Sequence, residues 1–191
     1  MNDKRLHLIG IAGHAQCGKD TAADYLCKIS NAAYWKDSFA NPIKGMLGVG
    51  LGLDREQLHG YLKDVVDPRF GKTPRQLMQT LGTEWGRELV HPNIWVYAMK
   101  SYLEGGVDMI DGRTRYIIPD VRFENEANFI RKFGVLIHIT GRDNNIKESD
   151  HVSEAGVLFQ EGDIEIRNDG SLNEFLMRVC DAYHVIANRD K

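Results

Sequence analysis

The sequence predicts an α/β fold around a central parallel sheet, and three observations carry this prediction. Short apolar runs without polar alternation, typical of strands buried on both faces, recur along the chain. Segments with helical spacing of apolar residues separate these runs. The composition is that of a globular protein, because 42% of the 191 residues are hydrophobic and 27% are charged. This composition excludes collagen-like, disordered and membrane-spanning classes.

The N-terminal part begins with strands and helices in alternation. Residues 6–12 (LHLIGIA) form an apolar run that predicts a buried strand. A helix is expected after Gly18, a second strand over 33–39, and another helix that opens at Pro42.

The region 54–106 shows helical patterns and no strand. We therefore expect one domain, residues 1–191, with a helical insertion over 54–106 that binds a substrate. The clearest helix in it has Thr73 as N-cap, Pro74 at the first helical position and Gln76 as capping-box partner. Apolar residues then recur every four positions and predict one buried stripe: Leu77, Leu81, Trp85 and Leu89.

Strand and helix patterns alternate again after the insertion. We expect a strand over 115–120, a helix over 124–133, a strand over 135–140 and a short strand over 164–166. Ser171 and Glu174 form a second capping box. The buried side of the helix that follows is predicted to hold Leu172, Phe175, Leu176, Val179 and Tyr183.

Charge and cysteine content exclude several functional classes. The chain has 27 acidic and 24 basic side chains, a net charge of -3, whereas a protein that coats nucleic acid usually has a basic excess. Three cysteines without a CxxC pair argue against a disulfide scaffold or a zinc site and favour a reducing cytoplasm. The first apolar run, about seven residues long, is too short for a signal peptide or a membrane span. We therefore expect a soluble, intracellular protein.

Residues 13–21 (GHAQCGKDT) fit the GxxxxGK pattern of a phosphate-binding loop between a predicted strand and a predicted helix. Gly13 and Gly18 let the loop turn so that its backbone N–H groups point at phosphate oxygens, and the helix dipole favours an anion there. The Lys19 ammonium would reach the β- and γ-phosphates. The alternative is a glycine-containing turn that binds nothing.

The residue after the lysine of such a loop usually binds magnesium through a hydroxyl group. Here Asp20 takes that place and Thr21 follows it. The sequence leaves open which of the two contacts the metal.

Two charged residues follow the strand over 115–120. Asp120 is a candidate for holding the metal through water, with a structural capping role as the alternative. Arg122 is expected at the carboxyl end of the sheet, where ligands of open α/β folds bind. It could neutralise charge on a transferring phosphoryl group, with a surface salt bridge as the alternative.

Arg75 and Gln79 are four residues apart on the helix after Thr73 and share a face. An arginine could grip a phosphate and a glutamine could pair with a base edge, whereas the alternative is a solvated face. Trp95 could stack on a base or belong to the core.

The order of motifs resembles that of the bacteriophage deoxynucleoside monophosphate kinases of the T-even type, which move the γ-phosphate of ATP onto a deoxynucleotide. The loop alone is unspecific, but the combination of motifs is specific. The matching motifs are GKDT (18–21), NPIK (41–44), RQLMQTLGTEW (75–85), IWV (94–96), YIIPDVR (116–122) with Glu126, HVSEAG (151–156) and NDGSLNE (168–174). The stretch 48–70 matches poorly.

The resemblance implies a P-loop NTPase fold of the nucleoside monophosphate kinase type, a three-layer sandwich with a helical acceptor-binding insertion. It implies ATP with Mg²⁺ as cofactors and Lys19 and Arg122 as catalytic residues. The implied ATP site comprises Gly13, His14, Ala15, Gly18, Lys19, Asp20, Thr21, Asn168 and Gly170, with the last two near the adenine. The implied acceptor site comprises Lys44, Arg75, Gln79, Trp95, Asp120 and Glu126.

The implied partner is a small-molecule deoxynucleoside monophosphate, with no nucleic acid polymer and no membrane. A homodimer is left open, and the expected compartment is the cytoplasm, that of the host if a phage encodes the chain. The chain departs from its relatives at Ala15 and Gln16, where they carry basic residues, and at Gln76, where they carry a second basic residue beside Arg75.

Two other functions stay open at this point. One is a kinase for another small phosphorylated acceptor, such as phosphomevalonate or dephospho-coenzyme A. The other is a nucleotide-binding regulator without transfer activity. The glutamine of the acceptor helix and Trp95 favour a base, and the presence of both Lys19 and Arg122 counts against the regulator.

Overall fold

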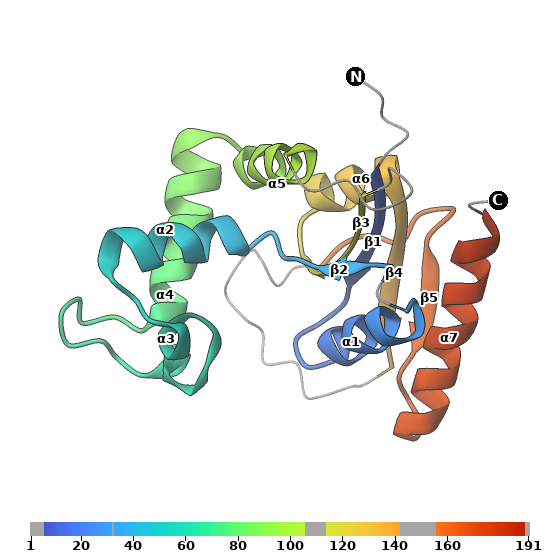
Figure 1. Ribbon diagram of the computed structural model, residues 1–191. Helices are drawn as coiled ribbons and strands as arrows, with labels where there is room; N and C mark the ends of the chain where they lie inside the picture. Colours follow the sequence, from blue (N-terminus) through green and yellow to red (C-terminus); the bar gives the residue numbers. More distant parts are fainter. Residues whose placement is uncertain (1–5, 32, 106–113, 142–155, 190–191) are drawn as a thin grey trace. The chain divides into compact units, whose positions relative to one another are not determined.

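The computed structural model describes residues 6–31, 33–105, 114–141 and 156–189 (Figure 1). The chain divides into two compact units. The first consists of Met1–Ser38 with Gly105–Lys191, and the second is Phe39–Glu104. The substrate-binding role predicted for residues 54–106, and a single kinase domain over 1–191, stay predictions.

The first unit is a parallel α/β structure, as the sequence predicts. Its five strands form one sheet in the order β2-β3-β1-β4-β5, and each neighbouring pair is parallel. This arrangement is consistent with a nucleoside monophosphate kinase type of P-loop fold. The elements are β1 (Leu6–Ala12), α1 (Lys19–Ile29), β2 (Trp35–Lys36), β3 (Thr114–Val121), α6 (Glu124–Phe133), β4 (Gly134–Thr140), β5 (Ile164–Arg167) and α7 (Leu172–Arg189).

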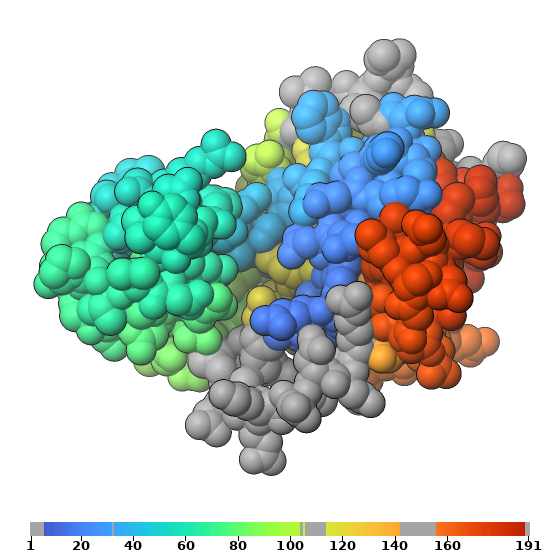
Figure 2. Space-filling model, turned by 90° about the horizontal axis from the view of Figure 1, so that it is seen from below, coloured from blue at the N-terminus to red at the C-terminus, as the bar shows by residue number. Residues whose placement is uncertain are grey.

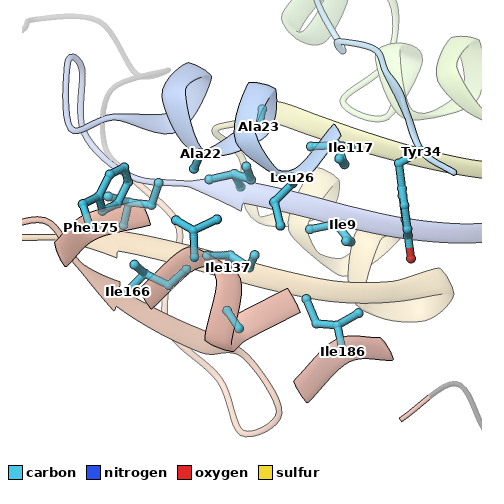
Figure 3. Packing of buried hydrophobic residues seen from close by; sticks show 14 of the residues in the cluster. Ile9, Ala22, Ala23, Leu26, Tyr34, Ile117, Ile137, Ile166, Phe175 and Ile186 are labelled. Atoms are coloured by element: carbon cyan, nitrogen blue, oxygen red, sulfur yellow. The ribbon is translucent and has the colours of Figure 1, made fainter. Parts of the chain in front are cut away.

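Strand β1 shows how helices cover both faces of this sheet. Ile9 and Ile11 belong to a buried cluster with side chains of α1 and α7 (Figure 3). Gly10 faces the other way, where an added Cβ would come within 2.7 Å of the Ile130 side chain in α6. The sheet therefore lies between α1 and α7 on one face and α6 on the other, which gives three layers.

Two predictions for the first unit need correction. The strand predicted over 33–39 is reduced to Trp35–Lys36, because β2 is an edge strand that pairs with β3 at these two residues alone. Leu172 was predicted to be buried but is 56% exposed, since it is the first residue of α7 and precedes the buried stripe that begins at Phe175.

The second unit consists of helices around a small core of its own. Figure 2 shows part of its surface in teal and green. The elements are α2 (Asn41–Leu51), α3 (Arg55–His59), η2 (Tyr61–Asp64), α4 (Pro74–Gln79), η3 (Thr80–Val90) and α5 (Ile94–Glu104). The core contains Ile43, Leu47, Leu53, Leu58 and Trp95. None of the helices within the described ranges is both long and apolar enough to span a bilayer.

The capping box at the start of α4 is confirmed, but the long apolar stripe after it is not. Gln76 N–H donates to Thr73 Oγ1 at 3.1 Å, and Thr73 N–H donates to Gln76 Oε1 at 2.9 Å. Segment η3 is a π-helix, whose i→i+5 hydrogen bonds put more residues in each turn than an α-helix has. The predicted stripe leaves the core along this segment, since Trp85 is 38% and Leu89 80% exposed.

Candidate functional site

The loop between β1 and α1 depends on its two glycines. Gly13 has φ +145° and Gly18 has φ +108°, both in the region that side chains rarely adopt. An added Cβ would also lie 2.6 Å from the Ile139 carbonyl oxygen at Gly13, and 2.8 Å from Asn168 Nδ2 at Gly18. The backbone thus turns sharply against β4 and the end of β5, as a phosphate-binding loop requires.

The Lys19 side chain folds back over this loop. Its Nζ donates to the carbonyl oxygens of Gly13 at 2.7 Å and His14 at 2.5 Å. It also lies 3.8 Å from the Sγ atom of Cys17, a buried residue. The ammonium is therefore held at the mouth of the loop, in reach of an anion bound there.

Lys19 and Arg122 contribute to one pocket of the first unit. The pocket is lined by Gly13, His14, Ala15, Lys19, Val121, Arg122 and Gly156. Val121 ends strand β3, so this pocket lies at the carboxyl edge of the parallel sheet. The structure thus brings together the two cations that the sequence predicts as catalytic, and their catalytic role stays a prediction.

Glu126 holds the backbone around Arg122. Its side chain is buried, with 2% exposure, and its Oε2 accepts hydrogen bonds from Arg122 N–H at 2.8 Å and Phe123 N–H at 3.1 Å. These bonds fix the turn from β3 into α6, from which the Arg122 side chain projects. The observed contacts of Glu126 are therefore to the backbone, and the substrate contact predicted for it stays a prediction.

Asp120 is oriented by a residue that the sequence did not single out. Ser38 Oγ donates to Asp120 Oδ2 at 2.6 Å, across 82 positions of the sequence. Ser38 N–H in turn donates to Oδ1 of the buried Asp37 at 2.6 Å. The ends of β2 and β3 therefore meet in a small polar cluster, and Asp120 is a member of it.

Asp20 lies in an ion pair at the start of α1. Lys36 Nζ lies 3.1 Å from Asp20 Oδ1 and 2.8 Å from Asp24 Oδ1. Burial by itself lowers the pKa of Lys36, but the hydrogen bonds to Asp24 and Asp20 outweigh burial and raise that pKa. The metal contact predicted for Asp20 or Thr21 stays open.

No group of three or more His, Cys, Asp or Glu side chains gathers as a metal site within the described ranges. Magnesium at a nucleotide site is usually held by one or two protein ligands, waters and phosphates. Asp20, Thr21 and Asp120 fit that pattern, because their side chains offer the oxygen atoms that magnesium prefers.

Asn168 and Gly170 follow β5, and only one of them is exposed. Asn168 is 3% exposed, and its Nδ2 donates to the Cys17 carbonyl oxygen at 2.8 Å. Gly170 is exposed beside Glu174. The predicted proximity of both residues to an adenine stays a prediction.

The predicted acceptor residues Lys44, Arg75, Gln79 and Trp95 all lie in the second unit. Arg75 forms a two-pronged ion pair with Asp64, with Nε–Oδ1 at 2.5 Å and Nη2–Oδ2 at 3.0 Å. This pairing lowers the pKa of Asp64. The guanidinium is half exposed, which keeps it accessible to an anion.

Lys44 lies beside a histidine from the stretch that matches the phage kinases poorly. Its Nζ is 3.3 Å from His59 Nδ1. Burial lowers the pKa of His59, and the positive charges of Lys44, Arg55 and Lys63 lower it further. The second unit therefore gathers cations around His59, and Lys44 is one of them.

Trp95 belongs to the core of the second unit. The indole is 2% exposed, its Nε1–H donates to the Gly82 carbonyl oxygen at 2.7 Å, and an added Cβ at Gly86 would lie 2.6 Å from its ring. A ring this buried offers no open face to a base. The structure therefore favours the core alternative for Trp95, whereas Gln79 is half-buried at the end of α4.

A family model described as deoxynucleotide monophosphate kinase matches residues 71–179. A protein of Acanthamoeba polyphaga mimivirus that carries this kinase name is 31% identical over 183 residues, which cover 90% of this chain and 93% of the viral protein. The chain belongs to the deoxynucleotide monophosphate kinase family.

Two phage relatives support this family assignment. The deoxynucleotide monophosphate kinase of Enterobacteria phage T4 is 25% identical to this chain. The match covers 95% of this chain and 100% of the phage protein. The deoxynucleoside-5'-monophosphate kinase of Escherichia phage T5 is 32% identical, over 78% of this chain and 84% of its own length. Membership of the kinase family makes this chain a phosphotransferase that uses nucleotides.

The sequence contains no signal for four residues that contact the predicted site residues. Ser38, Lys36, His59 and Asp64 contact predicted residues but belong to no motif. The family motif HVSEAG falls on residues 151–156, of which 151–155 lie outside the described residues. Its last residue, Gly156, lines the pocket with Lys19 and Arg122.

Proposed function

We propose that this chain transfers the γ-phosphoryl group of ATP to a deoxynucleoside monophosphate, giving a deoxynucleoside diphosphate and ADP. One observation carries the proposal: Lys19 and Arg122 line a single pocket at the carboxyl edge of the sheet, in a member of a family named for this activity. Phosphoryl transfer needs chiefly positioning and charge neutralisation, which two cations and a phosphate-binding loop supply.

The residues of the first unit would each have a separate role in binding ATP and in phosphoryl transfer. The loop N–H groups would bind the phosphates, and the Lys19 ammonium would exchange its contacts with the carbonyls of Gly13 and His14 for phosphate oxygens. Arg122, held at its backbone by Glu126, would face the charge that develops on the transferring group. Asp20 or Thr21, and Asp120 through water, would hold Mg²⁺, which neutralises charge on the phosphates when bound.

The residues of the second unit would bind the acceptor. Arg75 and Lys44 carry the positive charge for the monophosphate, and Gln79 carries an amide that could pair with a base edge. Further parts of this proposal are that neither a nucleic acid polymer nor a membrane is a partner and that the protein is cytoplasmic, whereas the oligomeric state is left open.

Product analysis tests the proposal most directly. The protein is incubated with ATP, Mg²⁺ and each common deoxy- and ribonucleoside monophosphate separately, and the nucleotides are separated by chromatography. We expect diphosphate from a subset of the deoxynucleotides. That outcome establishes the reaction and gives the base selectivity together.

Two other outcomes would contradict the proposal in different ways. Transfer to phosphomevalonate or dephospho-coenzyme A in place of any nucleotide would indicate another acceptor. ATP binding without ADP release would indicate a regulator. Lys19→Ala is the control in both cases, because it removes the ammonium of the phosphate-binding loop.

A further inference from the structure

Asn168 connects the end of the sheet to the phosphate-binding loop from its buried side. Its backbone N–H donates to the Thr140 carbonyl oxygen at 2.7 Å, at the end of β4. Its side-chain Nδ2 donates to the Cys17 carbonyl oxygen at 2.8 Å, in the middle of the loop. We propose that Asn168 is a positioning residue, which orients a loop peptide so that it binds the phosphates of a nucleoside triphosphate.

The bond to Cys17 fixes a peptide plane that Gly18 shares. A trans peptide unit is planar, and its C=O and N–H point in opposite directions. Because Asn168 holds the Cys17 carbonyl on the buried side, the N–H of Gly18 points to the other side of the loop. Backbone N–H groups of such loops are the donors that bind phosphate. Asn168 thus sets the direction of one donor from the buried side of the loop.

The space around Gly18 supports the same role. An added Cβ at Gly18 would lie 2.8 Å from Asn168 Nδ2 and 3.3 Å from the Phe175 ring, and the φ of Gly18 is +108°. The amide therefore packs directly on the loop glycine. This close contact requires a glycine at position 18 and an asparagine at position 168. Gly18 and Asn168 therefore hold the loop in place together.

The unpaired side-chain oxygen of Asn168, Oδ1, argues against a purely stabilising role for this residue. Asn168 Oδ1 is buried and has no hydrogen-bond partner among the described residues. A buried unpaired acceptor costs about 1–3 kcal/mol. This cost offsets what the single side-chain bond contributes to stability, and it leaves the orientation of the Cys17–Gly18 peptide as the main contribution of the side chain.

The inference rests on the proposed function only through ATP binding, and the acceptor does not enter it. The test is Asn168→Asp, which keeps the shape but replaces the Nδ2 donor by an oxygen that faces the Cys17 carbonyl. Calorimetry measures ATP binding, and a melting curve without nucleotide measures folding. We expect ATP affinity to fall roughly tenfold or more, with the KM for the acceptor unchanged. Asn173→Asp makes the same change at an exposed position of α7 and should leave ATP affinity as it is.

A folded Asn168→Asp protein with unchanged ATP affinity would overturn the proposal, even if its melting temperature is lower. Should that variant fail to fold, Asn168→Ala removes the donor together with the unpaired oxygen and is judged by the same affinity. The wild-type protein gives a third measurement, since ATP should shift the Gly18 amide resonance. An unshifted Gly18 resonance at saturating ATP would also overturn the proposal. If the wild type binds ATP but phosphorylates no deoxynucleotide, the proposed function fails and this test still decides the role of Asn168.

Discussion

The two units differ in how their candidate site residues are held. In the first unit, buried groups fix the backbone that carries the cations: Asn168 binds the loop at Cys17, and Glu126 binds the turn at Arg122. In the second unit, the candidate residues Arg75 and Lys44 are not buried and contact neighbouring side chains, Asp64 and His59.

This difference has a physical meaning for a kinase. A buried hydrogen bond to the backbone costs no reorganisation when the substrate arrives, so the first unit offers a preorganised site. An exposed ion pair is worth little and exchanges easily. The second unit therefore suits a ligand that competes with local partners for the same cations.

The largest effect on turnover is expected in the first unit, whose site is preorganised. Lys19→Ala should lower turnover roughly 10²–10³-fold, the range for the loss of one charge-stabilising donor, while the melting temperature stays near that of the wild type. Steady-state kinetics and a thermal melt check this. Lys28→Ala, an exposed lysine in the last turn of the same helix, is the control. Near-normal turnover of the Lys19 variant would contradict the loop assignment.

The second effect tests whether buried polar groups also stabilise the first unit. The Asp163 carboxylate is buried and lies 2.8 Å from Arg131 Nη2 and 2.9 Å from His138 Nε2. Asp163→Asn breaks this ion pair and should destabilise the fold by about 3 kcal/mol, as measured by denaturant unfolding at pH 7. Asp181→Asn, at an exposed position of α7, should have little effect.

The pH dependence of the same variant follows from the pKa of Asp163. Burial by itself raises this pKa, but hydrogen bonds from Arg131, the Gln160 N–H and His138 together lower it below its ordinary value of 3.8. A lowered folded-state pKa contributes stability above the unfolded value, and that stability is lost as the pH falls through the folded value. The difference between wild type and Asp163→Asn should shrink as the pH falls below about 4. A constant difference down to pH 2 would refute this account.

A smaller effect, on acceptor binding, is expected from the exposed residues of the second unit. Arg75→Ala should raise the KM for the acceptor about tenfold, the value of one charged hydrogen bond, and leave stability and the KM for ATP unchanged. Asp64→Asn is the matched control, because it removes the partner of Arg75 and keeps the guanidinium. It should leave the acceptor KM unchanged or lower it. If Arg75→Ala changed the KM for ATP alone, the acceptor site would lie elsewhere.

The smallest effect concerns His59. Its pKa is lowered from 6.5 by burial and then by Lys44, Arg55 and Lys63. The unfolded chain therefore binds this proton more readily, and the resulting loss of stability appears as the pH falls through 6.5. NMR titration of the wild type should place the pKa of His59 below 6.5, and Lys44→Ala should move it upward. A value at or above 6.5 in the wild type would show that these cations do not act on His59.

Local signals made much of this protein predictable. The phosphate-binding loop and the capping boxes at Thr73 and Ser171 each involve residues a few positions apart, and the structure contains all three. The wrong predictions concern the length of the edge strand β2 and the packing of apolar residues. Leu89 and Leu172 are exposed because periodicity alone does not tell where a buried stripe begins and where it ends.

The sequence by itself determined the parallel sheet, the loop glycines and Lys19, because these depend on short-range patterns of backbone geometry and burial. Only the tertiary structure decided what holds them. Ser38 reaches Asp120 across 82 positions and Asn168 reaches Cys17 across 151. No periodicity records such pairs, because they form only when the strands align at one edge of the sheet.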